Sequence, residues 1–156
     1  MARRTSSIVV SIDGGYASTA ALELALHEAE LRGTHVRALV CWPPEARHDD
    51  GEVLLCNTHA QAADLLDVVV ETVRRRHPDT VPVVGQVLHA PASAALVEAS
   101  ADADLLVLGS TAGTPTVQHH SRRILMHCLD LAISPVVVVP WTFDALAART
   151  GGPSSR

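Results

Sequence analysis

The sequence predicts an α/β fold, a doubly wound parallel β-sheet with helices on both of its faces. Short apolar runs, such as residues 105–108 and 136–139, are rich in Val and Leu and do not alternate with polar residues, which is typical of strands buried on both faces. Segments with the apolar spacing of helices lie between such runs, which indicates right-handed crossovers between parallel strands. Such sheets bind ligands beyond the carboxyl ends of their strands, so residues 109–123, which are predicted to form a loop, are the first candidate for a functional site.

The beginning of the chain predicts a strand followed by a helix. Residues 7–12 form the strand, which ends at the turn Asp13-Gly14-Gly15. Ser18 or Thr19 can cap the helix, and Gly33 suits the left-handed position that ends it. The apolar residues of one helix face recur at the expected spacing: Leu22, Ala25, Leu26 and Ala29.

The middle of the chain predicts a second strand and a long helix. The strand covers residues 36–42 and ends before two prolines, and residues 43–57 are assigned no element. The helix runs from residue 58 to about residue 76, where three arginines suit the negative end of its dipole, and Pro78 stops it.

Two further strands and two helices complete the predicted order β-α-β-α-β-α-β-α-β. The third strand covers residues 81–87, and Pro82 within it suggests an edge position. Pro91 fits the first turn of a helix through Ala101. We expect a single domain over residues 1–150 and a disordered tail at residues 151–156.

The composition of the 156 residues favours a globular protein, because 47% of them are hydrophobic and 19% are charged. The net charge of −5 and the lack of a basic face argue against a nucleic-acid partner. The apolar run near the N-terminus is too short for a signal peptide or a membrane helix, so we expect a cytoplasmic protein without a membrane partner. The three cysteines are widely spaced and predict reduced thiols.

Three segments, in their order and spacing, resemble one known family. IVVSIDGGYASTAALELALHEAELRG is similar to I-V-V-G-x-D-G-S followed by a helix of the form A-L-x-x-A-x-x-x-A. HAPASAALVEASADADLLVLGS is similar to G-x-P-A-x-x-I-L-x-x-A-x-x-x-x-A-D-L-I-V-V-G-S, and SPVVVVP resembles a closing C-P-V-L-V-V strand. These are the motifs of the universal stress proteins of the UspA type, and the resemblance covers roughly residues 6–140.

The resemblance implies a five-stranded parallel sheet in the order 3-2-1-4-5, of the Rossmann-like kind found in adenine nucleotide alpha hydrolase-like proteins. It also implies a homodimer in which the last strands of two protomers run antiparallel. An uncovered apolar edge strand would otherwise invite uncontrolled pairing. The residues that would form this seam are Val136, Val137, Val138 and Val139.

ATP-binding members of this family carry G-x-x-G, nine residues and then G-[ST] after the fourth strand. Glycines let the backbone approach phosphate oxygens, and successive N–H groups form an anion nest. Counting back from Pro135, Gly109-Ser110 matches the start of the motif, Gly113 stands one residue late, and Arg122-Arg123 replace the closing pair. The resemblance therefore implies a nucleotide site formed by Asp13, the backbone near Cys41, Gly109, Ser110, Gly113, Arg122 and Arg123.

The arginine pair leaves two interpretations open. Arg122 and Arg123 can bind phosphate through their guanidinium groups, or their bulk can fill the space that phosphates need. We expect an altered loop and a binding or regulatory protein that is not an ordinary ATP binder and has no named catalytic residue. The first alternative is an ATP-binding stress protein with slow ATPase activity, and the second is a small α/β enzyme that uses His89 or His119 as acid or base.

Several candidates also have purely structural interpretations. Asp13 can cap its own turn through its side chain, and Gly109 can serve only to let the chain leave its strand. His119, His120 and His127 lack the spacing of a metal site, so no metal is expected. Cys41 is predicted to be an inert buried thiol, and Cys56, placed in a loop, is the better candidate for redox chemistry.

Overall fold

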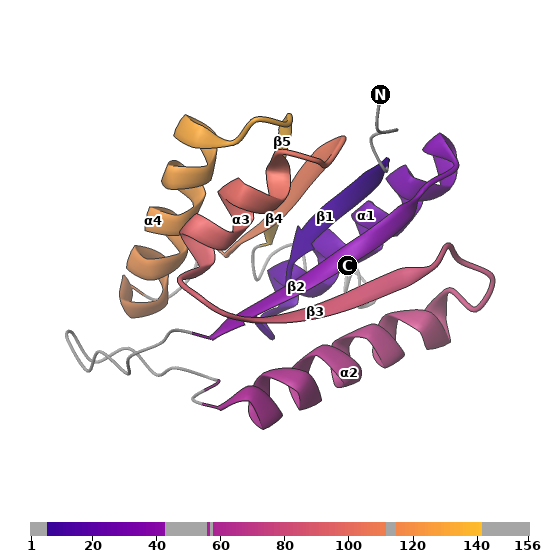
Figure 1. The fold of residues 1–156 in the computed structure, drawn as a ribbon. Helices are drawn as coiled ribbons and strands as arrows, with labels where there is room; N and C mark the ends of the chain where they lie inside the picture. Colours follow the sequence, from indigo (N-terminus) through magenta and orange to yellow (C-terminus); the bar gives the residue numbers. More distant parts are fainter. Residues whose placement is uncertain (1–5, 43–55, 57, 112–114, 142–156) are drawn as a thin grey trace, which may run out of the picture.

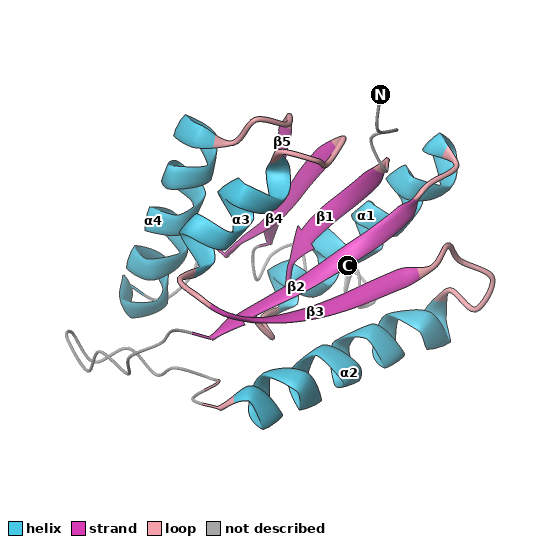
Figure 2. Ribbon diagram, viewed as in Figure 1, coloured by secondary structure: helices cyan, strands magenta, loops and turns pink. Residues whose placement is uncertain are grey.

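The fold of the computed structural model is a five-stranded parallel sheet with two helices on each face (Figures 1 and 2). The structure describes residues 6–42, 56, 58–111 and 115–141, and for residues 111 and 115–121 it describes the backbone alone. The elements follow the predicted alternation: β1 (Ser7–Ser11), α1 (Tyr16–Arg32), β2 (His35–Trp42), α2 (His59–Arg76), β3 (Val83–His89), α3 (Ala92–Ser100), β4 (Leu105–Thr111), α4 (Pro115–Leu131) and β5 (Val136–Trp141). The predicted tail, residues 151–156, lies outside the described residues.

The strand order is β3-β2-β1-β4-β5, with every neighbouring pair parallel. The predicted fold class, the strand order implied by the family resemblance and the edge position of the third strand are therefore confirmed. Pro82 precedes β3, and its carbonyl accepts a hydrogen bond from the Val36 N–H at 3.0 Å. Among the described residues, no helix combines the length and the apolar character needed to cross a membrane.

The apolar core has two layers, one on each face of the sheet. Ile8, Val10 and Ile12 of the first strand segment pack against residues of α1 and α2, whereas Val9 and Leu106 pack against residues of α3 and α4. The side chains of Ile8, Val9 and Val10 have no exposed surface, as expected for a central strand covered on both faces.

Helix α1 lies close to the sheet because its buried face is built from small residues. Ala17, Ala21, Ala25 and Ala29 recur every fourth position and are at most 2% exposed, and Leu22 and Leu26 flank them. Side chains four residues apart lie on one face of a helix, so this row of methyl groups lets the α1 backbone approach β4. Gly33 ends α1 in the left-handed conformation, with φ of 65°, as the sequence predicts.

Helix α2 begins and ends at the polar residues that its sequence provides. The Thr58 hydroxyl is the N-cap and accepts a hydrogen bond from the Gln61 N–H at 3.2 Å. The last turn carries the predicted arginines, of which Arg76 forms an ion pair with Glu23 of α1 at 2.8 Å. Helix α3 has Pro91 at its N-cap position, one residue before the predicted first turn.

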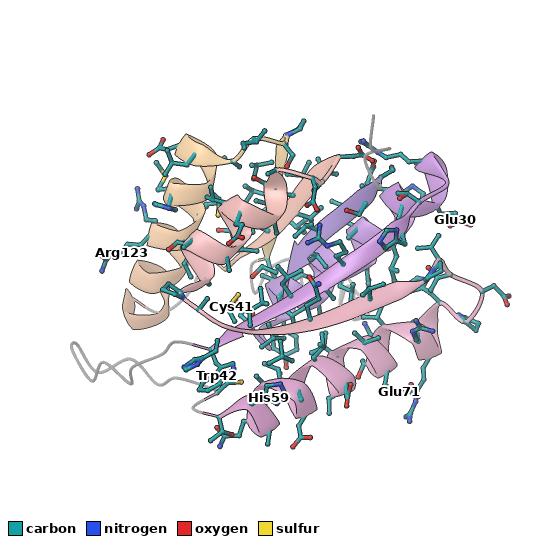
Figure 3. The ribbon with its side chains drawn as sticks, viewed as in Figure 1. Glu30, Cys41, Trp42, His59, Glu71 and Arg123 are labelled. Carbon is teal, nitrogen blue, oxygen red and sulfur yellow. The ribbon has the colours of Figure 1, made fainter. Side chains whose placement is uncertain are left out.

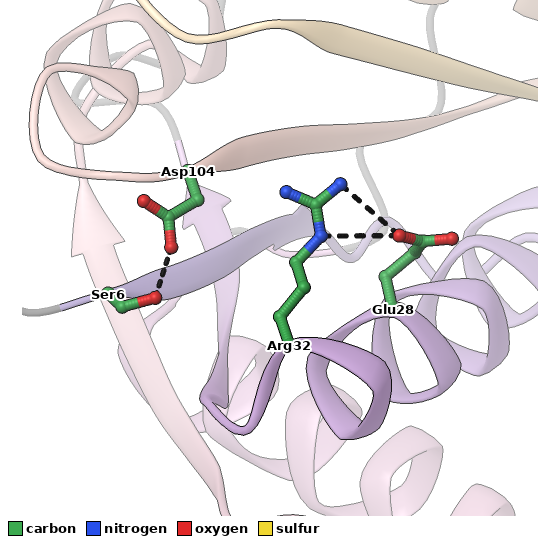
Figure 4. Close-up of polar contacts among 4 residues, drawn as sticks. All are labelled: Ser6, Glu28, Arg32 and Asp104. Carbon is green, nitrogen blue, oxygen red and sulfur yellow. Dashed lines mark hydrogen bonds and ion pairs between the residues drawn. The ribbon is translucent and has the colours of Figure 1, made fainter.

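Two polar contacts lie at the amino edge of the sheet (Figure 4). The Ser6 hydroxyl donates to the Asp104 carboxylate, which connects the segments that enter β1 and β4. Arg32 pairs with Glu28 one turn earlier on α1 at 3.3 Å. Solvent reaches both contacts, so they stabilise the fold by little.

Candidate functional site

The carboxyl edge of the sheet contains a switch point between β1 and β4. These strands are neighbours, yet β1 leads to α1 on one face and β4 leads towards α4 on the other. Diverging connections leave room for a ligand above the two strands, which makes this edge the candidate site. Asp13 follows β1, Cys41 and Trp42 end β2, and Gly109 and Ser110 lie near the end of β4.

Asp13 organises the turn between β1 and α1. Its Oδ1 accepts a hydrogen bond from the Gly15 N–H at 2.8 Å, and Gly14 between them has φ of 85°, a conformation that favours glycine. The capping interpretation of Asp13 is therefore confirmed. The side chain is exposed, so a carboxylate that already orders the turn also faces solvent at the switch point.

The predicted N-cap of α1 is wrong. The helix begins at Tyr16 with Gly15 as its N-cap, and Gly15 has no side chain with which to cap. Ser18 and Thr19 lie inside the first turn, where their hydroxyls donate to the Gly15 carbonyl at 3.0 and 3.3 Å. Ser18 and Thr19 are the hydroxyl residues next to the helix start, so the sequence suggested them as caps. The polar side chain that orders this turn is instead that of Asp13, which accepts a hydrogen bond from the Gly15 N–H.

Gly109 has a packing role that the sequence did not reveal. It lies inside β4, and a Cβ atom on it would be 2.5 Å from the carbonyl carbon of Ala17 and 2.7 Å from the Ser18 nitrogen. The missing side chain therefore faces the first turn of α1. Ser110 is half-buried and stands beside Pro140 of β5, while Gly113 lies outside the described residues.

The predicted loop over residues 109–123 is too long. Strand β4 continues to Thr111, and α4 begins at Pro115, so Arg122 and Arg123 are the eighth and ninth residues of a helix. Proline suits the first position of a helix, because the N–H that it lacks would have no partner there. The N–H groups of residues this far into a helix point at carbonyls of the preceding turn and do not form an anion nest.

Both arginine side chains are exposed. Figure 3 shows Arg123 projecting outward from α4, on the side away from the sheet, while Cys41 and Trp42 lie at the end of β2. The structure thus brings together Asp13, Gly109 and Ser110 at the ends of β1 and β4, with Cys41 at the end of the next strand. Arg123 is directed away from this group.

The thiols of Cys41 and Cys56 have the features of unreactive cysteines. Cys41 is half-buried, so the prediction of a buried residue is only partly met. Burial still raises the pKa of its thiol to about 11, which agrees with the prediction of an inert residue. Cys56 is 8% exposed and belongs to the core cluster beneath α1 and α2, and burial raises the pKa of its thiol too. The redox interpretation of Cys56 is therefore wrong. The sequence suggested a position in an exposed loop, whereas the side chain lies in the core.

Two aromatic stacks flank the switch point, and the sequence-based reasoning missed both. Trp42 stacks on His89 of β3 with ring centroids 3.7 Å apart and planes at 9°. Tyr16 stacks on Trp141 of β5 with centroids 6.2 Å apart and planes at 22°. The signal that could have found them is the position of the aromatic residues in the sequence. Only 3% of the chain is aromatic, and both tryptophans described by the structure are the last residues of strands.

His89, the candidate acid or base of the enzyme alternative, is thus one half of an aromatic stack. The backbone of His119 and His120 is helical, but their side chains lie outside the described residues. Among the described residues, no group of three or more His, Cys, Asp or Glu side chains is arranged to hold a metal ion.

A surface cavity of about 340 Å³ lies at the opposite edge of the sheet, between α1 and the turn after α2. None of the six described site candidates lines it. Its lining residues are mostly polar: Glu23, Leu26, His27, Glu30, Arg76, His77, Pro78, Asp79 and Thr80.

Comparison with known proteins gives one family and many similar folds. The sequence model described as the universal stress protein family matches residues 5–140. Among curated proteins, no match was found.

Three solved structures illustrate the likeness. A universal stress protein in complex with cAMP is 17% identical, with a TM-score of 0.62 and coverage of 86% of this chain and 95% of that chain. The Archaeoglobus fulgidus universal stress protein in complex with dAMP is 21% identical, with a TM-score of 0.60 and coverage of 85% and 96%. An Arabidopsis thaliana universal stress protein family protein with AMP bound is 16% identical, with a TM-score of 0.58 and coverage of 90% and 94%. At these identities the likeness shows a shared fold.

Proposed function

Since the chain belongs to the universal stress protein family, we propose that it is a regulatory binding protein for an adenine nucleotide with a single phosphate, and not an ordinary ATP binder. The observation that carries the proposal is the switch point, where an exposed carboxylate, Asp13, stands above β1 beside the end of β4. The three relatives of similar fold described above were solved with AMP, dAMP or cAMP, each of which carries one phosphate.

Asp13 supports recognition of the ribose. Its Oδ1 already accepts the Gly15 N–H, which fixes the direction of the side chain, and an exposed carboxylate retains capacity to accept further hydrogen bonds. Ribose hydroxyls are suitable donors for such a group. The same negative charge disfavours a phosphate at this end of the site.

The two ends of the family's phosphate motif argue against a triphosphate cradle. Gly109 is needed for the contact with α1, so its presence does not by itself indicate phosphate binding. Arg122 and Arg123 lie two turns into α4, where backbone N–H groups donate to carbonyls of the preceding turn, and their side chains are exposed. The altered loop is therefore part of the proposal, and slow ATPase activity belongs to the alternative in which ATP binds.

Thermal unfolding with added nucleotide tests this function. A ligand at a hundredfold its Kd stabilises the native state by about 2.7 kcal/mol, which raises the Tm by several degrees in a domain of this size. We expect AMP to raise the Tm and ATP-Mg at the same millimolar concentration to leave it nearly unchanged. An equal or larger shift with ATP-Mg would favour the ATP-binding alternative, and no shift with either would contradict nucleotide binding.

Asp13→Asn is the matched variant, because the amide keeps an oxygen that can accept the Gly15 N–H. We expect an unchanged Tm without ligand and a reduced shift with AMP. An unchanged shift would show that the carboxylate has no role in binding. In a second variant, Arg122→Gly with Arg123→Ser, a new ATP-Mg shift would show that the bulk of these side chains obstructs the triphosphate.

We also propose that the protein forms a homodimer through β5, an edge strand in this structure. The Leu106 N–H donates to the Pro135 carbonyl at 2.9 Å, and Leu106 stands beside Val136 in the register. Backbone groups alternate in direction along a parallel strand, so Val136 and Val138 direct their N–H and C=O groups away from β4. These are the groups available to a second β5.

Helix α4 adds an apolar surface next to this edge. Met126 and Leu129 of α4 are each 48% exposed, and Ile133, two residues after the end of the helix, is 68% exposed, although all three are large and apolar. Cys128 faces the core, and the next residue of a helix points about a quarter of a turn away from it. In a right-handed crossover from β4 to β5, this quarter turn directs Leu129 towards the β5 edge and away from α3. Two protomers joined about a two-fold axis at β5 would bring their α4 surfaces together.

We also propose that the protein is located in the cytoplasm. The thiols of all three cysteines are unpaired, which fits a reducing compartment.

A further inference from the structure

The cavity between α1 and the turn after α2 is separate from the switch point. Its volume of about 340 Å³ is at the lower end of the range for sites that bind small ligands. One face of α1 lines it with residues at helical spacing, namely Glu23, Leu26, His27 and Glu30. Because none of the described candidates for the nucleotide site lines this cavity, a ligand here would be independent of nucleotide binding.

The cavity has an apolar floor and an ordered wall. Leu26 is 3% exposed and belongs to the core cluster beneath α1 and α2, so it forms the floor. The wall opposite α1 is the turn that begins at His77, whose N–H donates to two carbonyls in the last turn of α2 at 3.0 and 3.2 Å. Pro78 follows with a φ angle fixed by its ring, which limits the freedom of this wall before any ligand binds.

The lining contains more carboxylates than cations. Glu23 forms an ion pair with Arg76 at 2.8 Å, which joins α1 to the end of α2. Glu30 and Asp79 are exposed, and within the part of the chain that the structure describes their carboxylates form no ion pair or hydrogen bond. Figure 3 shows Glu30 near the end of α1, on the side of the turn that follows α2. Three carboxylates and one guanidinium give the lining a charge of −2 when the imidazoles are neutral.

The end of α2 also favours a positively charged ligand. The carbonyl groups at the C-terminus of this 18-residue helix form the negative end of its dipole. Two of the three arginines in the last turn, Arg75 and Arg76, are already paired with Glu71 and Glu23. Among the described residues, no group of His, Cys, Asp and Glu side chains is arranged to hold a metal ion. A cavity with an apolar floor therefore suits an organic cation better than a metal.

We propose that this cavity binds a short linear alkyl diamine. One ammonium group lies at Glu30, the other lies at Asp79, and the methylene chain lies over Leu26. An ammonium group donates up to three hydrogen bonds, and those to carboxylates are stronger than those between neutral groups. The methylene groups bury apolar surface on the floor. The neutral imidazoles of His27 and His77 can accept further hydrogen bonds from the ammonium groups.

Three ligands with the same four-carbon chain test the need for two positive charges. Wild type is titrated in a calorimeter with diaminobutane, butylamine and butanediol. We expect diaminobutane to bind, and butylamine to bind about tenfold more weakly because one charged hydrogen-bonded contact is lost. Butanediol should not bind at millimolar concentration. Equal binding of butanediol and diaminobutane, or no binding of diaminobutane at millimolar concentration, would overturn the proposal.

Charge-removing variants test the two ends of the ligand. Glu30→Gln and Asp79→Asn each remove one carboxylate from the lining, and Asp67→Asn removes one from an exposed position on α2 outside the cavity. We expect about a tenfold loss of affinity for diaminobutane in each of the first two variants and no loss in the third. An equal loss in Asp67→Asn would overturn the site, because it would indicate a general attraction of an acidic protein for cations. Unchanged affinity in Glu30→Gln and Asp79→Asn would overturn it as well.

Proton NMR of the imidazole groups locates the diamine independently. The sequence contains nine histidines, of which His27 and His77 line the cavity, and the variants His27→Gln and His77→Gln assign their signals. We expect diaminobutane to shift these two signals and to leave those of the other histidines in place. Equal shifts of all the histidine signals would place the diamine outside this cavity and overturn the proposal.

Discussion

The thiol groups of Cys41 and Cys128 make the stability of the protein sensitive to alkaline pH. Burial raises the pKa of each to about 11 in the folded state, from an ordinary value of 9.0. The sequence contains no lysine, since all twelve basic residues are arginine, so few other side chains titrate in this range. Burial also raises the pKa of the Cys56 thiol, which therefore acts in the same direction, and the effect of Cys41 and Cys128 is found by comparison with a variant that lacks both.

The sign of the effect follows from which state binds more protons. Below pH 9 the thiols are protonated in both states, and their contribution to the free energy of unfolding is constant. Between pH 9 and about 11 they ionise in the unfolded chain while they remain protonated in the fold, so the free energy of unfolding falls as the pH rises.

We expect urea unfolding to reveal this loss between pH 9 and 11. In the double variant Cys41→Ala with Cys128→Ala, the free energy of unfolding should be lower at pH 8 because core volume is lost, but its decline with pH should be shallower. Parallel declines in the variant and the wild type would contradict the assignment to these thiols.

At the scale of elements, the contact between α1 and β4 joins two segments far apart in the sequence. The alanine row of α1 and Gly109 of β4 leave space for each other, and a Cβ atom at position 109 would overlap backbone atoms of Ala17. Backbone atoms within a helix cannot move aside as a side chain can. The same substitution at Gly85 would meet only the side chain of Leu66, with Cδ2 at 2.7 Å and Cγ at 3.3 Å, and a leucine side chain can rotate.

These two glycines give a matched pair of variants. We expect Gly109→Ala to lower the free energy of unfolding by about 3 kcal/mol or more, the upper end of the usual cost of overpacking. Gly85→Ala should cost less, about 1 kcal/mol. Chemical denaturation measures both. Equal stability of Gly109→Ala and wild type would mean that the glycine serves the loop or a ligand and not the packing of α1.

The contrast between Gly109 and its sequence context explains what could be predicted. Local patterns of apolar residues were enough for the order of the nine elements among the described residues, and the Asp-Gly-Gly sequence was enough for the turn at Asp13. The role of Gly109 depends on Ala17, which is distant in the sequence, so no local pattern reveals it. The segment before Arg122 contains Gly, Ser, Thr and Pro residues, which favour turns individually, but Pro115 starts a helix there instead.

At the scale of the whole molecule, the proposed dimer would join the β5 edges and the α4 surfaces of two protomers. Leu129→Glu puts a charge on the apolar surface without disturbing the core, because the residue is half exposed in one protomer. Val137 is a poorer choice for a charge, because its side chain packs against the core cluster. Val68→Glu on α2 is the matched control on a surface remote from β5.

We expect sedimentation to give a dimer for wild type and Val68→Glu, and a monomer for Leu129→Glu. The Tm of the two dimers should rise with protein concentration, because association stabilises the folded state by mass action. A wild-type Tm that is independent of concentration, together with a monomeric mass, would rule out the dimer.

The strand order also determines when the chain can fold during synthesis. Strand β1 is made first and becomes the most deeply buried strand, but one of its two neighbours, β4, is residues 105–111. Until that segment leaves the ribosome, Ile8, Val9 and Val10 have an unpaired side in the nascent chain. Exposed strand edges of this kind promote aggregation. The central position of β1 therefore makes the growing polypeptide dependent on protection until β4 has been translated.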